Sequence, residues 1–430
     1  MVFASNLLGL GGTEKGLVGH ALALDRERFD VRALAIHASG PRQAQLEEAG
    51  ITVDCAGGDR KRLAELLEGA DIVQVFRQGN TEPLLPDAAR DAGVPFLVEW
   101  SMFGQVDRSP QERQFSCHLF NSQFCLLRYR ERVGDRSPEF HARHRVLYLG
   151  LDLEALRGRA PTAPEAKRAL GLDPAQPVVG RIGRADDLKW RNLLVDMIPT
   201  VVSRVPGVQF LFVGATPRKR ERLSRLGVLD RCRLEPPVLE DERLATYYAA
   251  CDVLVNAAEI GESQGLAMAE AMSLGIPVVT CSTPWGDNAQ IEFVEHGRTG
   301  YVANHARPFG EAVADLLEDP ELREKFGEAG RAKVDSMLDV HALTRQLERL
   351  YDGLLSGDGP PRDWSPSLEE VEGFQSEYAS RLEREYRPLT RRERIAAYVE
   401  RRRERWRQIA LHLNREGLLG VARRMRAKLG

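Results

Sequence analysis

One stretch of the chain, Cys251 to Cys281, combines residue types that can bind a phosphorylated ligand. Its sequence, CDVLVNAAEIGESQGLAMAEAMSLGIPVVTC, predicts a strand, a loop, a helix and a second strand. The loop follows the carboxyl end of a strand, and the helix that begins near Ser263 to Gly265 directs unpaired backbone N–H groups at a ligand. Ser263 is a suitable N-cap, and Gly265 lets a phosphate come close to the backbone. We therefore predict an anion site, suited to a diphosphate, at this helix start.

Two acidic residues, Glu262 and Glu270, stand eight positions apart across this helix start. Glu270 lies inside the apolar helix, so we expect a buried carboxylate, which costs several kcal/mol unless it accepts hydrogen bonds. Two ribose hydroxyls would supply them, and so would a neighbouring loop in a purely structural arrangement. Glu262 lies in the loop, where it either reaches a sugar or only places a favourable charge near a helix N-terminus, worth under about 1 kcal/mol.

Cations that match a diphosphate follow the first strand of the same region, in PVVGRIGRADDLKW (Pro177 to Trp190). Arg184 and Lys189 come after the carboxyl end of that strand, which in an open parallel sheet faces the same crevice as the helix start. Two positive groups there would neutralise a diphosphate as its bond to a sugar breaks. Arg181 is a weaker candidate because it falls within the strand pattern, and each of the three is alternatively a surface charge.

A glycine loop near the N-terminus, LGLGGTEKG (Leu8 to Gly16), also separates a predicted strand from a predicted helix. It is not the GxGxxG sequence of dinucleotide-binding proteins, which disfavours a nicotinamide dehydrogenase. A close approach of the backbone to a sugar or phosphate fits the loop, and a glycine turn without a ligand is the alternative.

Strand-like apolar runs alternate with helical patterns through most of the chain, which predicts an α/β protein with parallel sheets. One series of strands is expected near 2–5, 31–37, 72–75, 95–99, 118–121 and 145–149, and a second near 177–183, 208–213, 231–235, 252–256 and 276–281. A segment rich in Pro and Ala separates the two series. We therefore predict Rossmann-like domains over 1–157 and 177–356, a linker over 158–176, and a basic helical extension over 357–430.

The composition is that of an ordinary globular protein, with 43% hydrophobic and 29% charged residues among 430. No apolar run reaches the roughly 18 residues that span a bilayer, and the first residues enter the glycine loop without a basic leader. We therefore expect a cytoplasmic protein. The six cysteines show no CxxC spacing, so we expect buried thiols rather than disulfides or metal ligands.

The C-terminal extension is strongly basic, although the whole chain has a net charge of -3. From residue 381 to the end there are 16 Lys and Arg against 6 Asp and Glu, a balance of +10. Apolar residues recur there at helical intervals, from Ile395 to Leu413, and we expect this apolar stripe to be buried against another surface. The protein's own surface or a second subunit of a homo-oligomer would provide one, and an anionic surface at the inner face of a membrane is the alternative. No recognised nucleic-acid-binding module accompanies the arginines, so nucleic acid is not expected.

Taken together, these motifs resemble the retaining glycosyltransferases of family 4, which are group 1 glycosyltransferases, over roughly Met1 to Leu350. The E-x7-E pattern is present as Glu262 to Glu270, inside ESQGLAMAEAMSLGIPVV. Other similar segments are NLLGLGGTEKG, YLGLD, IGRADDLKW, FLFVGATP and EFVEHGRTGYV. E-x7-E alone is a weak pattern, but the set in this order and spacing is specific. The resemblance implies the GT-B fold, with two Rossmann-like domains facing across a cleft, the first for the acceptor and the second for the donor.

The resemblance also implies a role for each matching residue. Arg184 and Lys189 would bind the diphosphate of a nucleotide-sugar donor. Glu262 would contact the transferred sugar, and Glu270 would hold the ribose. The remaining donor contacts would come from Gly12 of the first domain, from the backbone of Ser263, Gln264, Gly265 and Leu266, and from residues 235–238 near the base. Members of the family keep the anomeric configuration without a metal ion or other cofactor, and the departing phosphate is thought to help deprotonate the acceptor hydroxyl.

The chain departs from the family pattern on the acceptor side, and other functions stay open. Many relatives carry a histidine in the first-domain loop that here reads EWSMFGQVD (Glu99 to Asp107), which has none. Either the backbone and Glu99 replace it, or the acceptor side is unusual. The alternatives are a nucleotide-sugar epimerase of the same fold, whose acid and base have no candidates here, and a non-catalytic sugar-nucleotide binding protein. The sugar, the base and the acceptor are not predicted.

Overall fold

The computed structural model describes residues 1–77, 83–283, 286–385 and 402. The basic tail predicted over 381–430 therefore lies almost wholly outside the described residues. The described residues divide into two compact units: a first unit of Met1–Ala155 with Lys333–Gln375, and a second unit of Leu156–Ala332 with the described residues from Ser376 onward. This division differs from the predicted domains, because residues 333–356 belong to the first unit rather than to the second.

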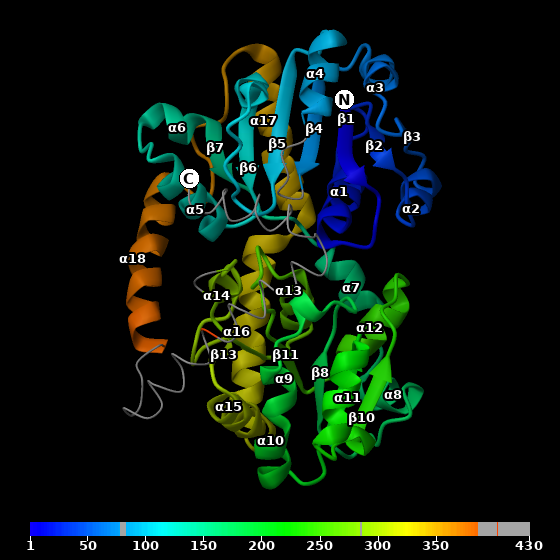
Figure 1. Cartoon of the computed structure of the whole chain (residues 1–430), viewed down its shortest axis with the longest axis vertical. Coiled ribbons are helices and arrows are strands. Elements are labelled where there is room, and N and C mark those ends of the chain that lie inside the picture. Colours follow the sequence, from blue (N-terminus) through cyan, green and yellow to red (C-terminus); the bar gives the residue numbers. More distant parts are fainter. Residues whose placement is uncertain (78–82, 284–285, 386–401, 403–430) are drawn as a thin grey trace. The chain divides into compact units, whose positions relative to one another are not determined.

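The first unit is built on a seven-stranded parallel sheet in the order β3-β2-β1-β4-β5-β6-β7 (Figure 1). Its strands are β1 (Val2–Leu7), β2 (Arg32–Ala38), β3 (Val53–Cys55), β4 (Ile72–Arg77), β5 (Phe96–Ser101), β6 (Phe115–Phe120) and β7 (His144–Val146). The strand order reverses between β1 and β4, as in the predicted doubly wound fold. Six of the strands coincide with predicted ones, and the short strand β3 was missed.

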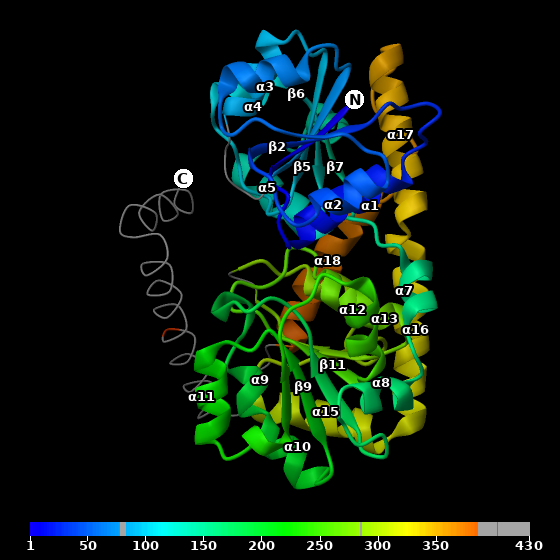
Figure 2. The ribbon, with the colours of Figure 1, turned by 90° about the vertical axis from the view of Figure 1, so that its right-hand side faces the viewer.

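Helices cover both faces of this sheet. They are α1 (Gly12–Ala23), α2 (Gln43–Glu48), α3 (Arg60–Leu67), α4 (Leu84–Asp91), the 3₁₀ helix η1 (Pro110–Gln114), α5 (Gln123–Val133), α6 (Pro138–Arg143) and α17 (Val340–Ser356); α7 (Leu153–Arg159) and α18 (Leu368–Glu385) cross from one unit into the other. Figure 2 shows α17 on one face and α3 and α4 on the other. Beneath α3 and α4, Leu63 and Leu85 join the core formed by the sheet's apolar residues.

Helix α17 returns to the first unit because its apolar stripe packs beside α1, and a buried histidine links the two helices. The Gly150 N–H donates a hydrogen bond to Nε2 of His20 on α1 (3.1 Å), so Nδ1 of His20 carries the proton and donates to Oγ1 of Thr344 on α17 (2.8 Å). Burial lowers the pKa of His20 to about 3, which keeps the ring neutral at neutral pH.

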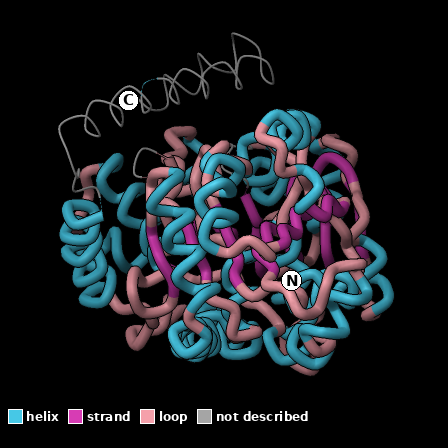
Figure 3. Tube along the Cα trace, turned by 90° about the horizontal axis from the view of Figure 1, so that it is seen from below, coloured by secondary structure: helices cyan, strands magenta, loops and turns pink. Residues whose placement is uncertain are grey.

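The second unit repeats the doubly wound plan with a six-stranded parallel sheet in the order β10-β9-β8-β11-β12-β13. Its strands are β8 (Val178–Arg181), β9 (Gln209–Val213), β10 (Cys232–Glu235), β11 (Val253–Asn256), β12 (Val278–Thr280) and β13 (Gly300–Val302). Figure 3 shows the strands with helices on both sides. All but β13 coincide with predicted strands, so the predicted fold class is confirmed.

The helices of the second unit supply most of its apolar core. They are α8 (Ala163–Ala169), α9 (Leu193–Asp196), α10 (Ile198–Arg204), α11 (Pro217–Arg225), α12 (Asp241–Ala249), α13 (Leu266–Ser273), α14 (Gln290–Phe293), α15 (Ala306–Glu318) and α16 (Pro320–Leu338, which runs on into the first unit), with short 3₁₀ turns η2 (Asp187–Lys189) and η3 (Leu229–Arg231). Buried side chains of α9, α10 and α15 pack on Phe210 and Phe212 of β9. This packing holds the carboxyl ends of the strands, and the loops that follow them, in a fixed frame.

The cysteines form no disulfide. All six are free thiols, as predicted, and four of them are buried, whereas Cys55 is exposed and Cys232 is half-buried. Among the described helices, none combines the length and the apolar character needed to cross a bilayer.

Substitution of Thr344 by Val tests the link between α1 and α17. The change keeps the shape of the side chain but leaves the Nδ1–H of His20 buried without an acceptor, which should cost about 1–3 kcal/mol. We expect a lower midpoint of chemical denaturation. Thr246→Val, on the exposed side of α12, is the control and should shift stability by less than about 0.5 kcal/mol. Equal midpoints for Thr344→Val and the wild type would contradict this role of the hydrogen bond.

Candidate functional site

The second unit brings the predicted cationic and acidic residues together where its strand order reverses. β8 and β11 are neighbours at this point, and the loops at their carboxyl ends, residues 182–190 and 257–265, carry Arg184, Lys189 and Glu262. A backbone hydrogen bond joins the two loops, since the Glu259 N–H donates to the Leu188 carbonyl oxygen (2.8 Å). The open-sheet rule therefore predicted the location of this cluster.

Lys189 and Glu262 form an ion pair across the two loops. The ammonium nitrogen of Lys189 lies 2.7 Å from Oε2 of Glu262 and 3.4 Å from the carbonyl oxygen of Gly261. The two side chains remain 18% and 14% exposed, so both are accessible to a ligand. An anion placed here would meet a cation that is already fixed in position.

Arg181 is a buried cation that organises the loop after β8. Its guanidinium donates hydrogen bonds to the carbonyl oxygens of Val213 (2.8 Å), Lys189 (3.0 Å) and Arg184 (3.3 Å). It also lies over the ring of Trp190, 4.3 Å from the centroid. Burial lowers the pKa of Arg181 to about 9, so the group still carries its charge at neutral pH. The sequence ranked Arg181 as the weakest of the three cations, and its place in the structure is that of a positioning residue.

Arg184 differs from Arg181 in that its side chain is exposed. Its carbonyl oxygen accepts hydrogen bonds from Arg181 and from the Asp186 N–H (3.0 Å), which fixes the backbone from which the side chain extends. Arg184 thus offers a solvated guanidinium on a constrained loop.

A buried amide holds the backbone of Glu262. The Glu262 N–H donates to Oε1 of Gln290 (3.1 Å), and Nε2 of Gln290 donates to the carbonyl oxygen of Cys281 (2.9 Å) and to Oγ1 of Thr283 (2.8 Å). Gln290 is 2% exposed. Gln290 was not among the predicted residues, because nothing in its local sequence marks it as a partner of a loop 28 positions away.

Helix α13 starts at Leu266 and its N-cap is Gly265, so the prediction that Ser263 caps this helix is wrong. Gly265 has a φ of +93°, and a Cβ at this position would lie 2.3 Å from Cε of Met268. Only glycine fits this turn without strain. The half-buried Ser263 and the buried Gln264 precede the turn, so the helix start directs its first N–H groups to the end of the Glu262 loop.

Glu270 is buried inside α13, as predicted, and one of its partners belongs to the protein. The hydroxyl of Tyr248 on α12 donates to Oε2 of Glu270 (2.5 Å). Burial, followed by the charge of Glu270, raises the pKa of Tyr248 well above its ordinary value, so the tyrosine stays a donor. The two interpretations differ in what donates to the second carboxylate oxygen, Oε1: a ribose hydroxyl of the ligand, or another group of the protein.

Glu235, in the region that the resemblance places near the base, ends β10 as a buried carboxylate. It pairs with the guanidinium groups of Arg233 (2.6 Å) and Arg243 (3.2 Å) and accepts a hydrogen bond from the hydroxyl of Tyr247 (3.1 Å). These contacts fix the end of the strand next to β9 in the sheet.

Two predicted residues, Gly12 and Glu99, lie in the first unit. Gly12 is exposed and is the first residue of α1, so the helix begins inside the predicted glycine loop of Leu8 to Gly16. Glu99 on β5 is buried and pairs with Arg77 (3.0 Å) and with Nδ1 of His118 (2.5 Å). Both oxygens of its carboxylate therefore contact buried side chains of the unit, which argues against Glu99 replacing the missing family histidine at an acceptor. His118 was not predicted. A glutamate and a histidine inside apolar strands are unusual, and this feature of the sequence could have marked Glu99 and His118 as a buried polar pair.

Comparison with known proteins shows a family likeness within the second unit. Residues 176–319 match the family model described as glycosyl transferases group 1. The spore coat protein SA of Bacillus subtilis is 22% identical over 299 residues, which cover 66% of this chain and 78% of that protein. The D-inositol 3-phosphate glycosyltransferase of Segniliparus rotundus is 32% identical over 219 residues, 48% of this chain and 44% of the relative. A lipopolysaccharide core mannosyltransferase of Rhizobium meliloti, LpsB, is 28% identical over 44% of this chain and 56% of its own length.

Solved structures extend the likeness to the fold of both units. The HepE protein of Anabaena superposes with a TM-score of 0.67 at 20% identity, covering 82% of this chain and 99% of its own. The glycosyltransferase WaaG superposes with a TM-score of 0.59 at 16% identity over 81% and 98%. The chain is therefore similar to the group 1 glycosyltransferases over residues 176–319, and it has the GT-B fold of these solved structures.

Proposed function

We propose that this protein is an enzyme, a retaining, family 4 glycosyltransferase that moves a sugar from a nucleotide-diphosphate donor to an acceptor hydroxyl in glycan, polysaccharide or glycoconjugate synthesis. The observation that carries the proposal is the Lys189–Glu262 ion pair, 2.7 Å across, at the switch point of the second unit. A paired cation and carboxylate beside a helix N-terminus suit a ligand with an anionic leaving group next to a polyhydroxyl group.

The donor diphosphate would be bound by three kinds of positive group. Lys189 and Arg184 supply full charges, and the N–H groups at the start of α13 supply partial ones. Their positions are constrained by Arg181 and by the Gly265 turn, so little reorganisation is needed when charge develops on the leaving phosphate. We infer that these cations take the place of a metal ion in the transfer step.

The sugar would lie against the Glu262 loop. In the proposed front-face reaction, the bond between the anomeric carbon and the diphosphate oxygen breaks while the acceptor oxygen bonds to the same face of that carbon. The acceptor's proton passes to the departing phosphate oxygen. Glu262 would orient the sugar through its hydroxyls, and Glu270 would accept hydrogen bonds from the ribose through Oε1.

Structural relatives suggest which nucleotide to try first. HepE was solved with UDP and with UDP-glucose. At 20% identity this likeness defines the fold, so it orders the candidates rather than selecting one. A uridine diphosphate sugar is the first candidate donor.

A panel of UDP-, GDP-, ADP- and TDP-sugars tests the proposed function by thermal shift and calorimetry. We expect one nucleotide class to raise the thermal midpoint and to bind at one site per chain. Donor hydrolysis or transfer, followed by NMR of the anomeric proton, should show retained configuration. The absence of binding by every donor would overturn the donor site, and inverted product would overturn the retaining mechanism.

Removal of either member of the ion pair should cripple transfer without unfolding the chain. For Lys189→Ala and Glu262→Ala we expect kcat/KM to fall by about 100-fold or more, as on removal of one group that stabilises a transition state. Arg307→Ala removes an exposed ion pair with Glu311 on α15 and is the matched control, with expected activity near that of the wild type. A rate within twofold of wild type in either site variant would refute the assignment.

Glu270→Gln and Tyr248→Phe separate the two interpretations of Glu270. If the carboxylate binds the ribose, Glu270→Gln weakens the donor nucleotide by about 10-fold or more, the value of a charge-assisted hydrogen bond. Tyr248→Phe removes one hydrogen bond that the protein itself donates to Glu270, so it should lower stability and leave nucleotide affinity within a few fold. A Glu270→Gln variant that is less stable but binds nucleotide normally would make the carboxylate purely structural.

A further inference from the structure

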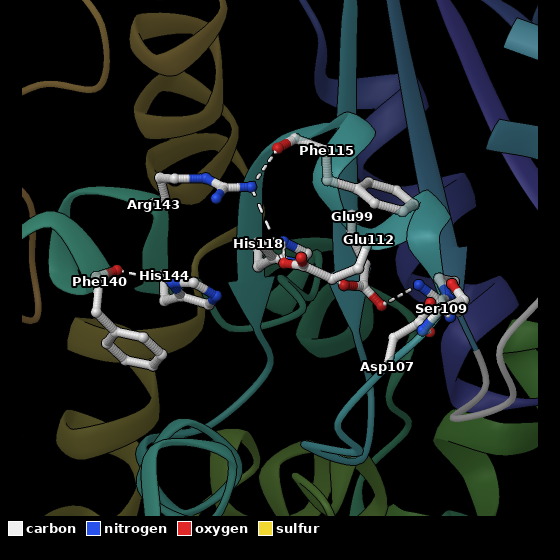
Figure 4. Close-up of polar contacts among 10 residues, drawn as sticks. Glu99, Asp107, Ser109, Glu112, Phe115, His118, Phe140, Arg143 and His144 are labelled. Carbon is white, nitrogen blue, oxygen red and sulfur yellow. Dashed lines mark hydrogen bonds and ion pairs between the residues drawn. The ribbon is translucent and has the colours of Figure 1, made fainter. Parts of the chain in front are cut away.

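A row of polar side chains crosses one face of the first unit's sheet. Glu99 on β5 lies in register with His118 on β6, and His118 lies in register with His144 on β7. Side chains in register on neighbouring parallel strands project from the same face. The two imidazole rings are stacked, with centroids 4.7 Å apart and planes inclined by 4° (Figure 4). His118 is 1% exposed and His144 is 7% exposed, so the row is internal.

Glu112 completes a cluster around the two rings. It lies on η1, immediately before β6, and its Oε1 is 3.2 Å from Nε2 of His118 (Figure 4). One ligand atom from each of Glu112, His118 and His144 lies within 4.8 Å of the other two. Two imidazoles and a carboxylate form a ligand set that zinc and other divalent transition metals use.

We propose that Glu112, His118 and His144 form a binding site for a divalent transition metal ion, with Zn²⁺ as the best match. A tetrahedral ion with bonds of about 2.0–2.1 Å holds its ligand atoms about 3.3 Å apart. The 3.2 Å separation of His118 and Glu112 is close to this value. His144 lies within 4.8 Å of both, and its ring must rotate out of its stack with His118 to direct Nε2 at the same ion. Three protein ligands leave a fourth position for water.

The hydrogen bonds around the cluster leave Nε2 of each histidine as the atom available to such an ion. Nδ1 of His118 donates to Oε2 of Glu99 (2.5 Å), and Nδ1 of His144 donates to the carbonyl oxygen of Phe140 (2.7 Å). Each bond fixes the tautomer whose Nε2 has a free lone pair, and carboxylates and backbone carbonyls are the partners that metal-binding histidines use. Glu99 is itself held by Arg77, 3.0 Å away.

The Nε2 atoms of both histidines are buried without a hydrogen-bond partner in the described part of the chain. Oε1 of Glu112 lies 3.2 Å from Nε2 of His118, so the carboxylate satisfies this nitrogen only when the ring is protonated. A buried unsatisfied polar atom costs about 1–3 kcal/mol. A shared ion would satisfy both nitrogens and the carboxylate at once.

A metal-free ion-pair network is the competing explanation. Burial opposes a charge on His118, but Glu112 and Glu99 offset it and raise the pKa of His118, so a protonated ring could bridge two carboxylates. Arg143 also approaches Oε1 of Glu112, at 4.0 Å, while its main hydrogen bond goes to the Phe115 carbonyl (2.7 Å). This network balances the charges of His118 but leaves Nε2 of His144 without a partner, which is the observation that favours the ion.

The ion would stabilise the edge of the sheet rather than take part in transfer. β7 is the last strand in the sheet order and is three residues long, and among the described strands it pairs only with β6. One ion bound by η1, β6 and β7 would join three segments that are otherwise connected by few backbone hydrogen bonds. The ligands belong to the first unit, whereas the residues proposed to bind the donor diphosphate belong to the second.

Metal analysis of the full chain, prepared without a histidine tag, tests the proposal. After chelator treatment, titration with ZnCl₂ should show one equivalent bound per chain and a higher thermal midpoint. Co²⁺ in its place should give the visible absorption of a tetrahedral site. His144→Gln and Glu112→Gln should bind at least about 10-fold more weakly, the loss expected for even a residue that only orients a ligand.

His141→Gln is the matched control, because His141 lies on α6 three residues before His144 and outside the cluster. It should bind zinc like the wild type. Glu112 is 22% exposed, so Glu112→Gln should fold, and circular dichroism checks this. Failure of the wild type to bind Zn²⁺ or Co²⁺, or equal affinity in Glu112→Gln and the wild type, would overturn the metal site and leave the ion-pair network.

Discussion

The candidate site of the second unit depends on one buried cation, the guanidinium of Arg181. A charge removed from water is costly unless hydrogen bonds and a polarisable surface replace the solvent. Here three carbonyl oxygens and the face of Trp190 replace it. Two of those carbonyls belong to Arg184 and Lys189, so the interaction that compensates the buried charge also fixes the loop that presents two accessible ones. Arg181 and the two accessible cations whose loop it holds, Arg184 and Lys189, thus lie within nine residues of sequence.

The ion pair between Lys189 and Glu262 solves an electrostatic problem that the proposed donor creates. A nucleotide diphosphate is an anion, and the carboxylate proposed to contact its sugar would repel it. Lys189 lies against that carboxylate and offsets its charge. The backbone of Glu262 is held by Gln290, and the loop of Lys189 by Arg181, so the two charges keep their separation independently of a ligand. Preorganised charges of this kind stabilise a transition state without a reorganisation cost.

Much of this arrangement could be predicted from the sequence, because it follows from local patterns. Buried parallel strands are apolar runs, and the residues after their carboxyl ends meet at the switch point, so the sequence predicts that Lys189 and Glu262 lie on neighbouring loops. Strands β3 and β13 were missed since three residues are too few to show a pattern. The sequence did not predict that α17 packs in the first unit, because an amphipathic stripe shows that one face of a helix is buried but not which element buries it. Ser263 looked like a cap, but the positive φ of Gly265 places the cap two residues later.

The polar row of the first unit illustrates what a sequence cannot show by itself. Glu99, His118 and His144 are each unremarkable in their own segments, and only the strand register brings them into one line. Because these side chains are buried, each of their polar atoms needs a hydrogen-bond partner or an ion inside the protein. In the second unit, Arg181 meets that demand with backbone carbonyls. In the first unit, Nε2 of His118 and of His144 lie near the carboxylate of Glu112. A cation with several coordination positions is the simplest partner that satisfies all three groups.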